Sequence, residues 1–393
     1  MAPDRSTVSQ LRRFQLSVFV ASIGISYFYL IPAFAERLGA GYLDLGLIGT
    51  IRSLPYTFLP VIAGYLGDRF GRRRLYLLSI FAVGAATLLL AVTDTIPGIM
   101  AVQGLLGIGL ALFWPISEAL VSGISSLHER AAAIGMYAVA WGSGFLIGPL
   151  TGGILAQEIG FQIAFLVAGM LMLTTSGISA LTIRGEQKQQ GNGQRVSVKP
   201  SWELIVAVLP MLLIQIPYAI VLAFVVSIFP GYAAVSGLTP LEVGVLLSGF
   251  GLTRTLAFSL AGRMQRVGER KSIGLGALGL GIVLLLIPTN GSFIALLADS
   301  CIMGVCIGMI YPPTVAYVSK RSPFENLGFA IGAYETIFGI GFTAGPILTG
   351  FIAQTMSADL ALLVLALIAL SIIPLLAFAR QDTSSPHAPA SKS

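Results

Sequence analysis

Long apolar segments follow one another along the chain and are separated by short polar stretches. A helix needs about 20 apolar residues to cross a bilayer, and twelve segments reach that length. We expect spans at residues 14–36, 43–67, 75–94, 97–123, 131–156, 161–183, 203–235, 240–262, 272–290, 292–318, 327–354 and 359–379. Because 203–235 carries Pro210, Pro217 and Pro230, we expect this span to bend. The pattern predicts an all-α integral membrane protein with twelve transmembrane helices.

Two polar regions divide this pattern. The stretch RGEQKQQGNGQRVSVKPS lies at 184–201, and the chain ends with QDTSSPHAPASKS at 381–393. We expect an N-terminal six-helix bundle at 1–183, a cytoplasmic central loop at 184–201 and a C-terminal six-helix bundle at 202–380. The small polar residues of 381–393 predict a disordered tail.

The composition agrees with a membrane protein. Of the 393 residues, 55% are hydrophobic and only 10% are charged, and the mean hydropathy is +0.88. Soluble domains carry about 25% charged residues. The chain therefore has too little polar surface to cover a water-soluble core.

The basic residues lie almost entirely on one side of the predicted spans. Of the 23 lysines and arginines, 20 precede the first span, follow an even-numbered span or lie in the tail. Cytoplasmic loops are enriched in basic residues, so we expect a multi-pass protein of the cell membrane with both termini in the cytoplasm. The net charge of +6 is then a topology signal, and we expect no nucleic-acid partner.

The two halves of the chain resemble each other. The stretch IGMYAVAWGSGFLIGPLTGGILAQ at 134–157 aligns with IGAYETIFGIGFTAGPILTGFIAQ at 331–354, with an offset of 197 residues. The same offset relates Pro115 to Pro312 and Arg69 to Arg266. Parallel repeats with a binding site between them are typical of transporters. We therefore expect two pseudo-symmetric halves around a central site.

Two motifs resemble signatures of the major facilitator superfamily. GYLGDRFGRRR at 64–74 resembles that family's loop 2–3 pattern, G-x-L-x-D-R-x-G-R-R/K, and GSGFLIGPLTGG at 142–153 resembles its span-5 pattern. The likeness covers the whole chain and is strongest to the twelve-span drug/proton antiporter-like branch. One departure is Met100, which precedes Gln103-Gly104 where the span-4 pattern of that branch has arginine.

The resemblance implies gating and packing roles for both motifs. The gating motif comprises Gly64, Asp68, Arg69, Gly71, Arg72 and Arg73, with Glu118 as a candidate partner. It would lie where span 2 meets span 11 and would close the cytoplasmic side. Small residues at four-residue spacing let helices approach closely. The interface helix motif comprises Gly144, Gly148, Pro149, Gly152, Gly153, Gly341, Gly345, Pro346 and Gly350.

Charges inside the spans are the remaining candidates for a site, because they are costly in hydrocarbon. They are Arg52, Arg254, Asp299 and Glu335, together with Glu118, which is assigned to the gate. Their depths favour Arg254 with Glu335, and Arg52 with Asp299 or a substrate. Further candidates, on spans that the resemblance implies line the cavity, are Gln103, Trp114, Tyr311, Gln215, Tyr27 and Tyr218. We expect no metal site and no cofactor.

The expected function is secondary active transport of a small organic solute by alternating access, as proton-coupled efflux, by a single copy in the bilayer. One alternative is an organic-anion uptake or exchange carrier that uses Arg52 and Arg254. Another is a non-transporting receptor or partner protein. We do not expect an enzyme, since HExxH is absent and His128 and His387 lie outside the spans. The chain also lacks the GxxxxGK[ST] phosphate loop of nucleotide-driven pumps.

Overall fold

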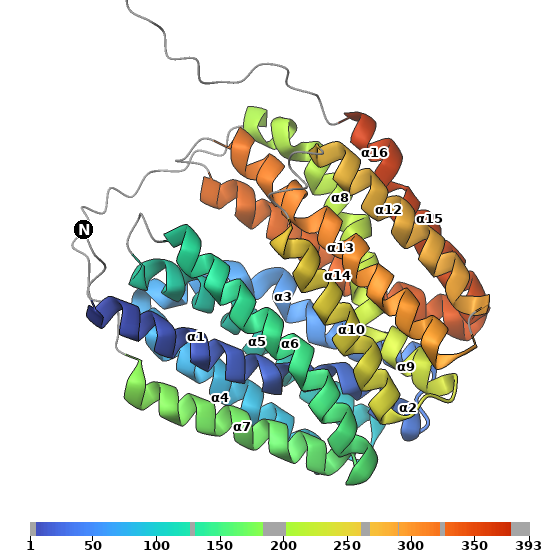
Figure 1. Cartoon of the computed structure of the whole chain (residues 1–393), viewed down its shortest axis with the longest axis horizontal. Coiled ribbons are helices and arrows are strands. Elements are labelled where there is room, and N and C mark those ends of the chain that lie inside the picture. The colour runs from blue at the N-terminus through green and yellow to red at the C-terminus, as the bar shows by residue number, and fades with distance from the viewer. Residues whose placement is uncertain are drawn as a thin grey trace, which may run out of the picture.

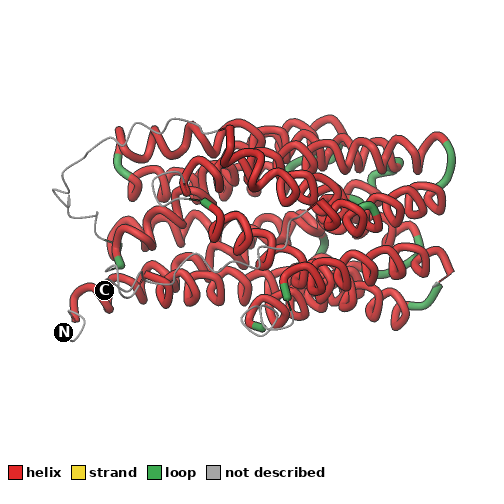
Figure 2. Tube along the Cα trace, turned by 90° about the horizontal axis from the view of Figure 1, so that it is seen from above, coloured by secondary structure: helices red, strands yellow, loops and turns green. Residues whose placement is uncertain are grey.

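The computed structural model describes residues 5–125, 130–183, 202–260, 268–289, 291–322 and 327–378, and every regular element there is a helix (Figure 2). The expected central loop at 184–201 and the expected tail at 381–393 lie outside these ranges. Within the helices, positions 5–7, 61, 64, 68, 130–132, 202–205, 207 and 327–329 are described by their backbone alone.

The elements before the central loop form the first half of the molecule. They are α1 (Arg5–Ser26), η1 (Tyr27–Leu30), α2 (Ile31–Arg37), α3 (Tyr42–Phe70), α4 (Arg72–Leu90), α5 (Ile96–Ile124), α6 (Arg130–Glu158) and α7 (Phe161–Thr182). The predicted span 14–36 is thus divided into α1, η1 and α2. Gly71, with φ of 91°, makes the sharp turn between α3 and α4, a backbone conformation that glycine adopts readily.

The elements after the central loop form the second half. They are α8 (Trp202–Ser227), α9 (Phe229–Val235), α10 (Pro240–Ser259), α12 (Glu269–Leu286), η2 (Ile287–Thr289), α13 (Phe293–Arg321), α14 (Leu327–Thr355), α15 (Ala358–Leu370) and α16 (Ile372–Phe378). The break between α8 and α9 confirms the bend expected in 203–235, and Pro230 lies in the first turn of α9.

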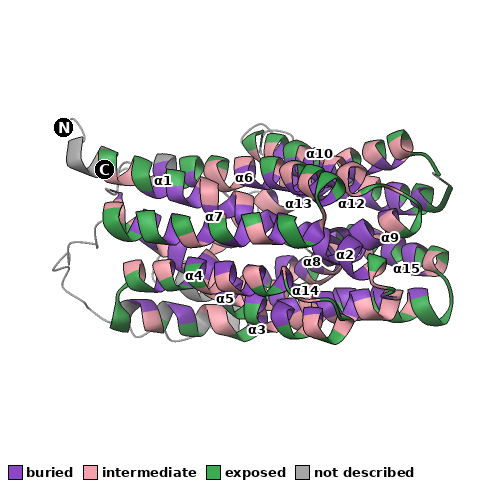
Figure 3. Ribbon diagram, turned by 90° about the horizontal axis from the view of Figure 1, so that it is seen from below, coloured by how far each residue is buried: buried purple, intermediate pink, exposed green. Residues whose placement is uncertain are grey.

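Eleven helical segments in the described part of the chain are long and apolar enough to cross a membrane. The twelfth expected span, 43–67, coincides with α3, which is not among these eleven. At 29 residues α3 is about 44 Å long, and it packs along α14 and α5. Figure 3 shows exposed residues along the outer faces of the helices. Large apolar side chains such as Leu181 and Phe351 are among the exposed ones, as expected for contact with lipid tails.

The two halves pack tightly at one end, which we call the packed end. Here α2 contacts α9, and Gly231 lies directly against the Leu45 side chain. Figure 1 shows α2 and α9 side by side at this end, with α1 and α16 beginning and ending on the opposite side of the molecule. Glycine at position 231 leaves room for Leu45, so the chain closes this end with side chains from both halves.

Two equivalent helix pairs join the halves. In α3, a Cβ on Gly46 would lie 2.6 Å from the Pro346 carbonyl oxygen of α14. In α6, a Cβ on Gly153 would lie 2.6 Å from the Pro240 carbonyl oxygen of α10. Small residues therefore allow backbone-to-backbone contact between the halves, as lipid-embedded helices require. Thr57 extends the first pair, because its hydroxyl donates to the Gly339 carbonyl at 3.1 Å.

The halves separate toward the other end, which we call the open end. A Cβ on Gly332 of α14 or on Gly135 of α6 would meet nothing within 4 Å. Both glycines lie on the same helices that touch the opposite half near the packed end. Among the described residues, the space beside these glycines indicates that the two interface helices lie farther from the opposite half here than at the packed end.

Candidate functional site

Arg52 lies in the middle of α3 and is buried, with 4% of its surface exposed. Its Nη2 donates to the Ser227 hydroxyl at 2.8 Å, across the interface between the halves. Its guanidinium carbon also lies 4.2 Å from the centre of the Phe28 ring, a cation–π contact. The described surroundings of Arg52 are therefore a hydroxyl and aromatic rings, and Asp299 is not among its described partners; the alternative expectation, that a substrate is its partner, stays a prediction.

Arg254 occupies a similar position in α10, with 7% of its surface exposed. Its guanidinium carbon lies 5.1 to 5.9 Å from the ring centres of Phe250, Trp141 and Phe258. Its Nε is buried and has no hydrogen-bond partner among the described residues. An ion pair with Glu335, which the depths favoured, is not formed in the described part of the chain.

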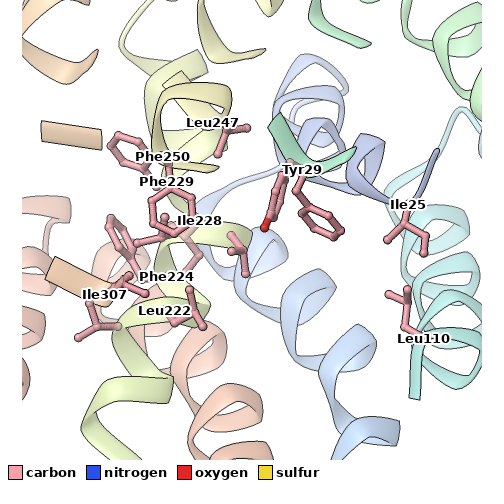
Figure 4. Close-up of a cluster of buried hydrophobic side chains, with 14 of the residues drawn as sticks. Ile25, Tyr29, Leu110, Leu222, Phe224, Ile228, Phe229, Leu247, Phe250 and Ile307 are labelled. Carbon is pink, nitrogen blue, oxygen red and sulfur yellow. The ribbon is translucent and has the colours of Figure 1, made fainter. Parts of the chain in front are cut away.

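Tyr29 brings the two arginines together. Its buried hydroxyl interacts electrostatically with both Arg254 and Arg52. Figure 4 shows Tyr29 in the layer of buried side chains between Ile25 of the first half and Phe250 of the second. We call Arg52, Arg254 and Tyr29 the arginine layer. It places two buried positive charges from opposite halves around one hydroxyl.

Two acids meet in a second layer. The Tyr311 hydroxyl of α13 donates to Oε1 of Glu335 in α14 at 3.3 Å, and Glu335 interacts electrostatically with Glu118 of α5. Glu118 is exposed although it belongs to a predicted span. We call Glu118 and Glu335 the acid layer. Carboxylates from opposite halves thus interact electrostatically across the interface, where they could bind a proton or a cation.

Equivalent tyrosines support the helices on both sides of the acid layer. The Tyr137 hydroxyl is hydrogen-bonded to the Ser117 hydroxyl at 2.7 Å, and the Tyr334 hydroxyl to the Thr314 hydroxyl at 2.7 Å. Both pairs are related by the offset of 197 residues. The internal repeat is therefore preserved in hydrogen bonds that fix α6 on α5 and α14 on α13.

Aromatic rings line the space between the two layers. Trp114 and Trp141 have ring centres 5.8 Å apart in the first half. In the second half, Tyr311 lies 6.1 Å from Tyr218 and 6.0 Å from Phe258. Rings of this kind present flat apolar faces and attract cations. The candidate residues Tyr218 and Tyr311 therefore do come together with Glu335, whereas Trp114 lies beside Trp141 in the first half.

The remaining candidates lie apart from the arginine layer and the acid layer, or lack a hydrogen-bond partner among the described residues. The side-chain amides of Gln103 and Gln215 are buried with no hydrogen-bond partner among the described residues. Tyr27 donates to Thr151 within its own half at 3.2 Å. Asp299 is buried in α13 and interacts electrostatically with Tyr232 of α9. Asp299 therefore lies near the packed end, apart from the acid layer.

The gating motif lies at the open end of α3 and α4. Arg73 donates to the Ile183 and Ala180 carbonyls at 2.6 and 2.5 Å, which stabilises the negative C-terminal end of α7. Arg72 donates to the Ala119 carbonyl at 3.4 Å, and Arg69 to the Tyr65 hydroxyl at 3.5 Å. The side chain of Asp68 and the surroundings of Gly64 lie outside the described residues. Glu118, the candidate partner of this motif, interacts electrostatically with Glu335, and its pairing with the motif stays a prediction.

The interface helix motif has two faces. Gly144, Gly148 and Gly152 pack against α1 and η1 of their own half, and Gly341 and Gly345 pack against α8 of theirs. Gly153 and Gly350 pack on the opposite half, and the backbones of Pro149 and Pro346 lie against Gly244 and Gly46 there. Each Gly-Pro helix therefore holds its own half together on one face and joins the halves on the other.

Sequence reasoning missed Tyr29, Trp141 and Tyr56, which surround the arginine and acid layers. Tyr137 and Tyr334 appeared only as matched positions of the repeat. A signal was present, since all five are aromatic residues within spans that carry charges or a motif. It could not be read without knowing which face of each helix points to the interface.

Comparisons with known proteins agree with these features. The family model of the Major Facilitator Superfamily matches residues 15–235 and 211–393. Multidrug resistance protein 1 of Bacillus subtilis is 25% identical over 344 residues, covering 86% of this chain and 87% of that protein. Quinolone resistance protein NorA of Staphylococcus aureus is 23% identical and covers 85% and 87%. An uncharacterized MFS-type transporter of Methanocaldococcus jannaschii is 24% identical and covers 87% and 90%.

Solved structures share the fold. A bacterial homologue of the human lysosomal transporter Spinster, in an inward-facing and occupied conformation, superposes with a TM-score of 0.73 at 16% identity, covering 96% of this chain and 95% of that one. A peptide transporter gives a TM-score of 0.76 at 15% identity, covering 94% of each chain. The family model covers nearly the whole sequence, and the same sequence folds into two helical halves that meet around buried charges; the chain belongs to the major facilitator superfamily.

Proposed function

We propose that the chain exports a small organic solute in exchange for protons, by alternating access across the cell membrane. In this proposal α3 is the twelfth span, both termini lie in the cytoplasm, and the open end faces the cytoplasm. Divergence of the interface helices at the open end supports such an inward-facing state. The names of the relatives in Bacillus subtilis and Staphylococcus aureus, which refer to multidrug and quinolone resistance, support export.

The observation that carries the proposal is the acid layer. Glu335 and Glu118 come from opposite halves, and Glu335 accepts a hydrogen bond from Tyr311. Two neighbouring carboxylates repel each other when both are ionised, so one of them binds a proton or a cationic substrate readily. Rocking of the halves would separate them and change that affinity. Competition between a proton and a cation for one pair of acids is sufficient for antiport.

A second candidate function is exchange of organic anions. The arginine layer favours it, because Arg52 and Arg254 are buried without a carboxylate partner among the described residues. In that case, the substrate would supply the negative charge.

Replacement of Glu335 by glutamine tests the proposal. Purified protein is reconstituted into vesicles with an acidic interior, and the membrane potential is held at zero with potassium and valinomycin. The parent should accumulate radiolabelled tetraphenylphosphonium as protons leave. Glu335→Gln should abolish this accumulation and still exchange labelled for unlabelled cation, since glutamine keeps the shape but cannot release a proton.

Glu158→Gln is the matched control, because Glu158 is exposed at the end of α6. It should accumulate the cation like the parent. Normal gradient-driven accumulation by Glu335→Gln at equal protein content would exclude Glu335 as the coupling acid.

A further inference from the structure

The arginine layer has the properties of a ligand-binding site. Arg52 and Arg254 are each more than nine-tenths buried, where a charge is costly unless it is paired. Their described partners are one serine hydroxyl, the Tyr29 hydroxyl and aromatic rings. The Arg254 Nε has no hydrogen-bond partner among the described residues. A guanidinium with a free donor is suited to bind a carboxylate by two parallel hydrogen bonds.

The arginine and acid layers lie about one helical turn apart. On α3, Arg52 is four residues from Tyr56, a neighbour of both acids. On α6, Trp141 at Arg254 is four residues from Tyr137, a neighbour of Glu118. Four residues of α-helix rise about 6 Å. Tyr218 interacts electrostatically with both Arg254 and Glu335, which places its ring between the layers.

The intervening rings determine what could span this distance. Trp141 and Phe258 are half-buried and have ring centres 6.4 Å apart. Both contact Arg254, and Phe258 also lies beside Tyr311 of the acid layer. A flat aromatic group could pack on these rings, and a ligand entering from the open end would move them aside to reach the arginines.

We propose that Arg52 and Arg254 bind the carboxylate of an amphoteric aromatic substrate whose ammonium group lies at Glu335 and Glu118. This inference rests on the proposed function and adds the substrate class. It also explains why one interface carries two buried cations and two acids that are not paired with each other. A purely cationic ligand would use only the acid layer, and a purely anionic ligand only the arginine layer.

The test compares two ligands that differ only in the carboxylate. The zwitterion 4-(aminomethyl)benzoate carries its charges at opposite ends of a benzene ring, and its methyl ester keeps only the ammonium group. Binding of each to the purified protein is measured by calorimetry. The parent should bind the zwitterion about tenfold more tightly than the ester, the scale of one charged hydrogen-bonded contact.

Lysine variants separate recognition from packing. Arg52→Lys and Arg254→Lys keep the charge but lose the two-pronged geometry, so each should reduce the preference for the zwitterion by about tenfold. Arg37→Lys makes the same change at an exposed position of α2 and should keep the preference. Glu335→Gln should weaken both ligands and leave their ratio unchanged. Thermal unfolding of each variant shows whether it is folded.

Three outcomes would overturn the anion site: no preference for the zwitterion in the parent, an unchanged preference in both lysine variants, or no binding of either ligand. If proton-driven accumulation of tetraphenylphosphonium persists in any of these cases, only the anion site is rejected. Absence of that accumulation in the parent would reject the proposed function itself, whichever ligand binds.

Discussion

The charged residues of the interface separate by sign. The cations lie in one layer around Tyr29, and the acids lie about one turn closer to the open end, around Tyr311. In the described part of this interface, Arg52 and Arg254 are therefore not neutralised by Glu118 and Glu335. A buried salt bridge would hold the halves in one arrangement, whereas separated charges leave both groups free to bind ions or substrate.

The repeated tyrosine hydrogen bonds give a prediction about stability. Tyr137→Phe and Tyr334→Phe each remove one buried hydroxyl, and we expect each to lower the free energy of unfolding by about 1 kcal/mol. The cost stays modest because Ser117 and Thr314 also donate to the backbone carbonyls of Trp114 and Tyr311. Unfolding of both variants in mixed micelles measures the two losses.

Tyr65→Phe is the control, since Tyr65 is exposed and should contribute little. Clearly unequal losses in Tyr137→Phe and Tyr334→Phe would show that the two halves do not use these hydrogen bonds equivalently.

Sequence reasoning found Arg52, Arg254 and Glu335, but the described residues do not form the expected pair of Arg254 with Glu335. The rise per residue gives the depth of a charged residue within its span, and the expected pairs were chosen by matching these depths. It does not give the direction in which a side chain points around the helix axis, which depends on how helices pack. Arg52 and Arg254 therefore lie at depths that would suit pairs with Asp299 and Glu335, although these acids face other residues.

At the scale of elements, the apolar pattern predicted most helices but not their interruptions. The span expected at 43–67 corresponds to α3 at Tyr42–Phe70. The prolines of 203–235 indicated the break before α9, whereas no proline precedes the turn of 3₁₀-helix at Tyr27–Leu30. The break at Ser371 between α15 and α16 was also missed. Hydropathy measures burial in lipid and carries little information about local backbone geometry.

The interface glycines give a prediction about the conformational equilibrium. A Cβ on Gly350 would overlap the Tyr42 carbonyl oxygen of α3 and come within 2.9 Å of the Gly46 Cα. Overpacking of this kind costs about 1–3 kcal/mol, and the cost falls only on the state in which the packed end is closed. Gly350→Ala should therefore increase opening of the packed end by about tenfold.

The measurement is the reaction rate of Leu45→Cys with a water-soluble maleimide, in protein whose Cys301 and Cys306 are replaced by alanine. Leu45 is fully buried at the packed end, so it reacts only when that end opens. Gly177→Ala lies in open space on the exposed side of α7 and should leave the rate unchanged. Equal rates in both glycine variants would contradict a packing role for Gly350.

In the whole molecule, the proposed function combines one binding region with one rocking motion of the two halves. The halves touch through equivalent helix pairs, α3 with α14 and α6 with α10. The charged layers lie between these pairs, so opening either end necessarily changes the surroundings of both acids and both arginines. Separate gates for proton and substrate are then unnecessary, because the same motion exposes them to the same side.

In the proposed function, substrate and protons move in opposite directions through one protein. A recording of internal pH tests this exchange, with a trapped dye in vesicles that have an acidic interior and are clamped at zero potential with valinomycin. Adding tetraphenylphosphonium outside should raise the internal pH in vesicles that contain the parent protein. In vesicles that contain Glu335→Gln, the internal pH should stay constant. Uptake of the cation by the parent without any change of internal pH would contradict proton-coupled exchange.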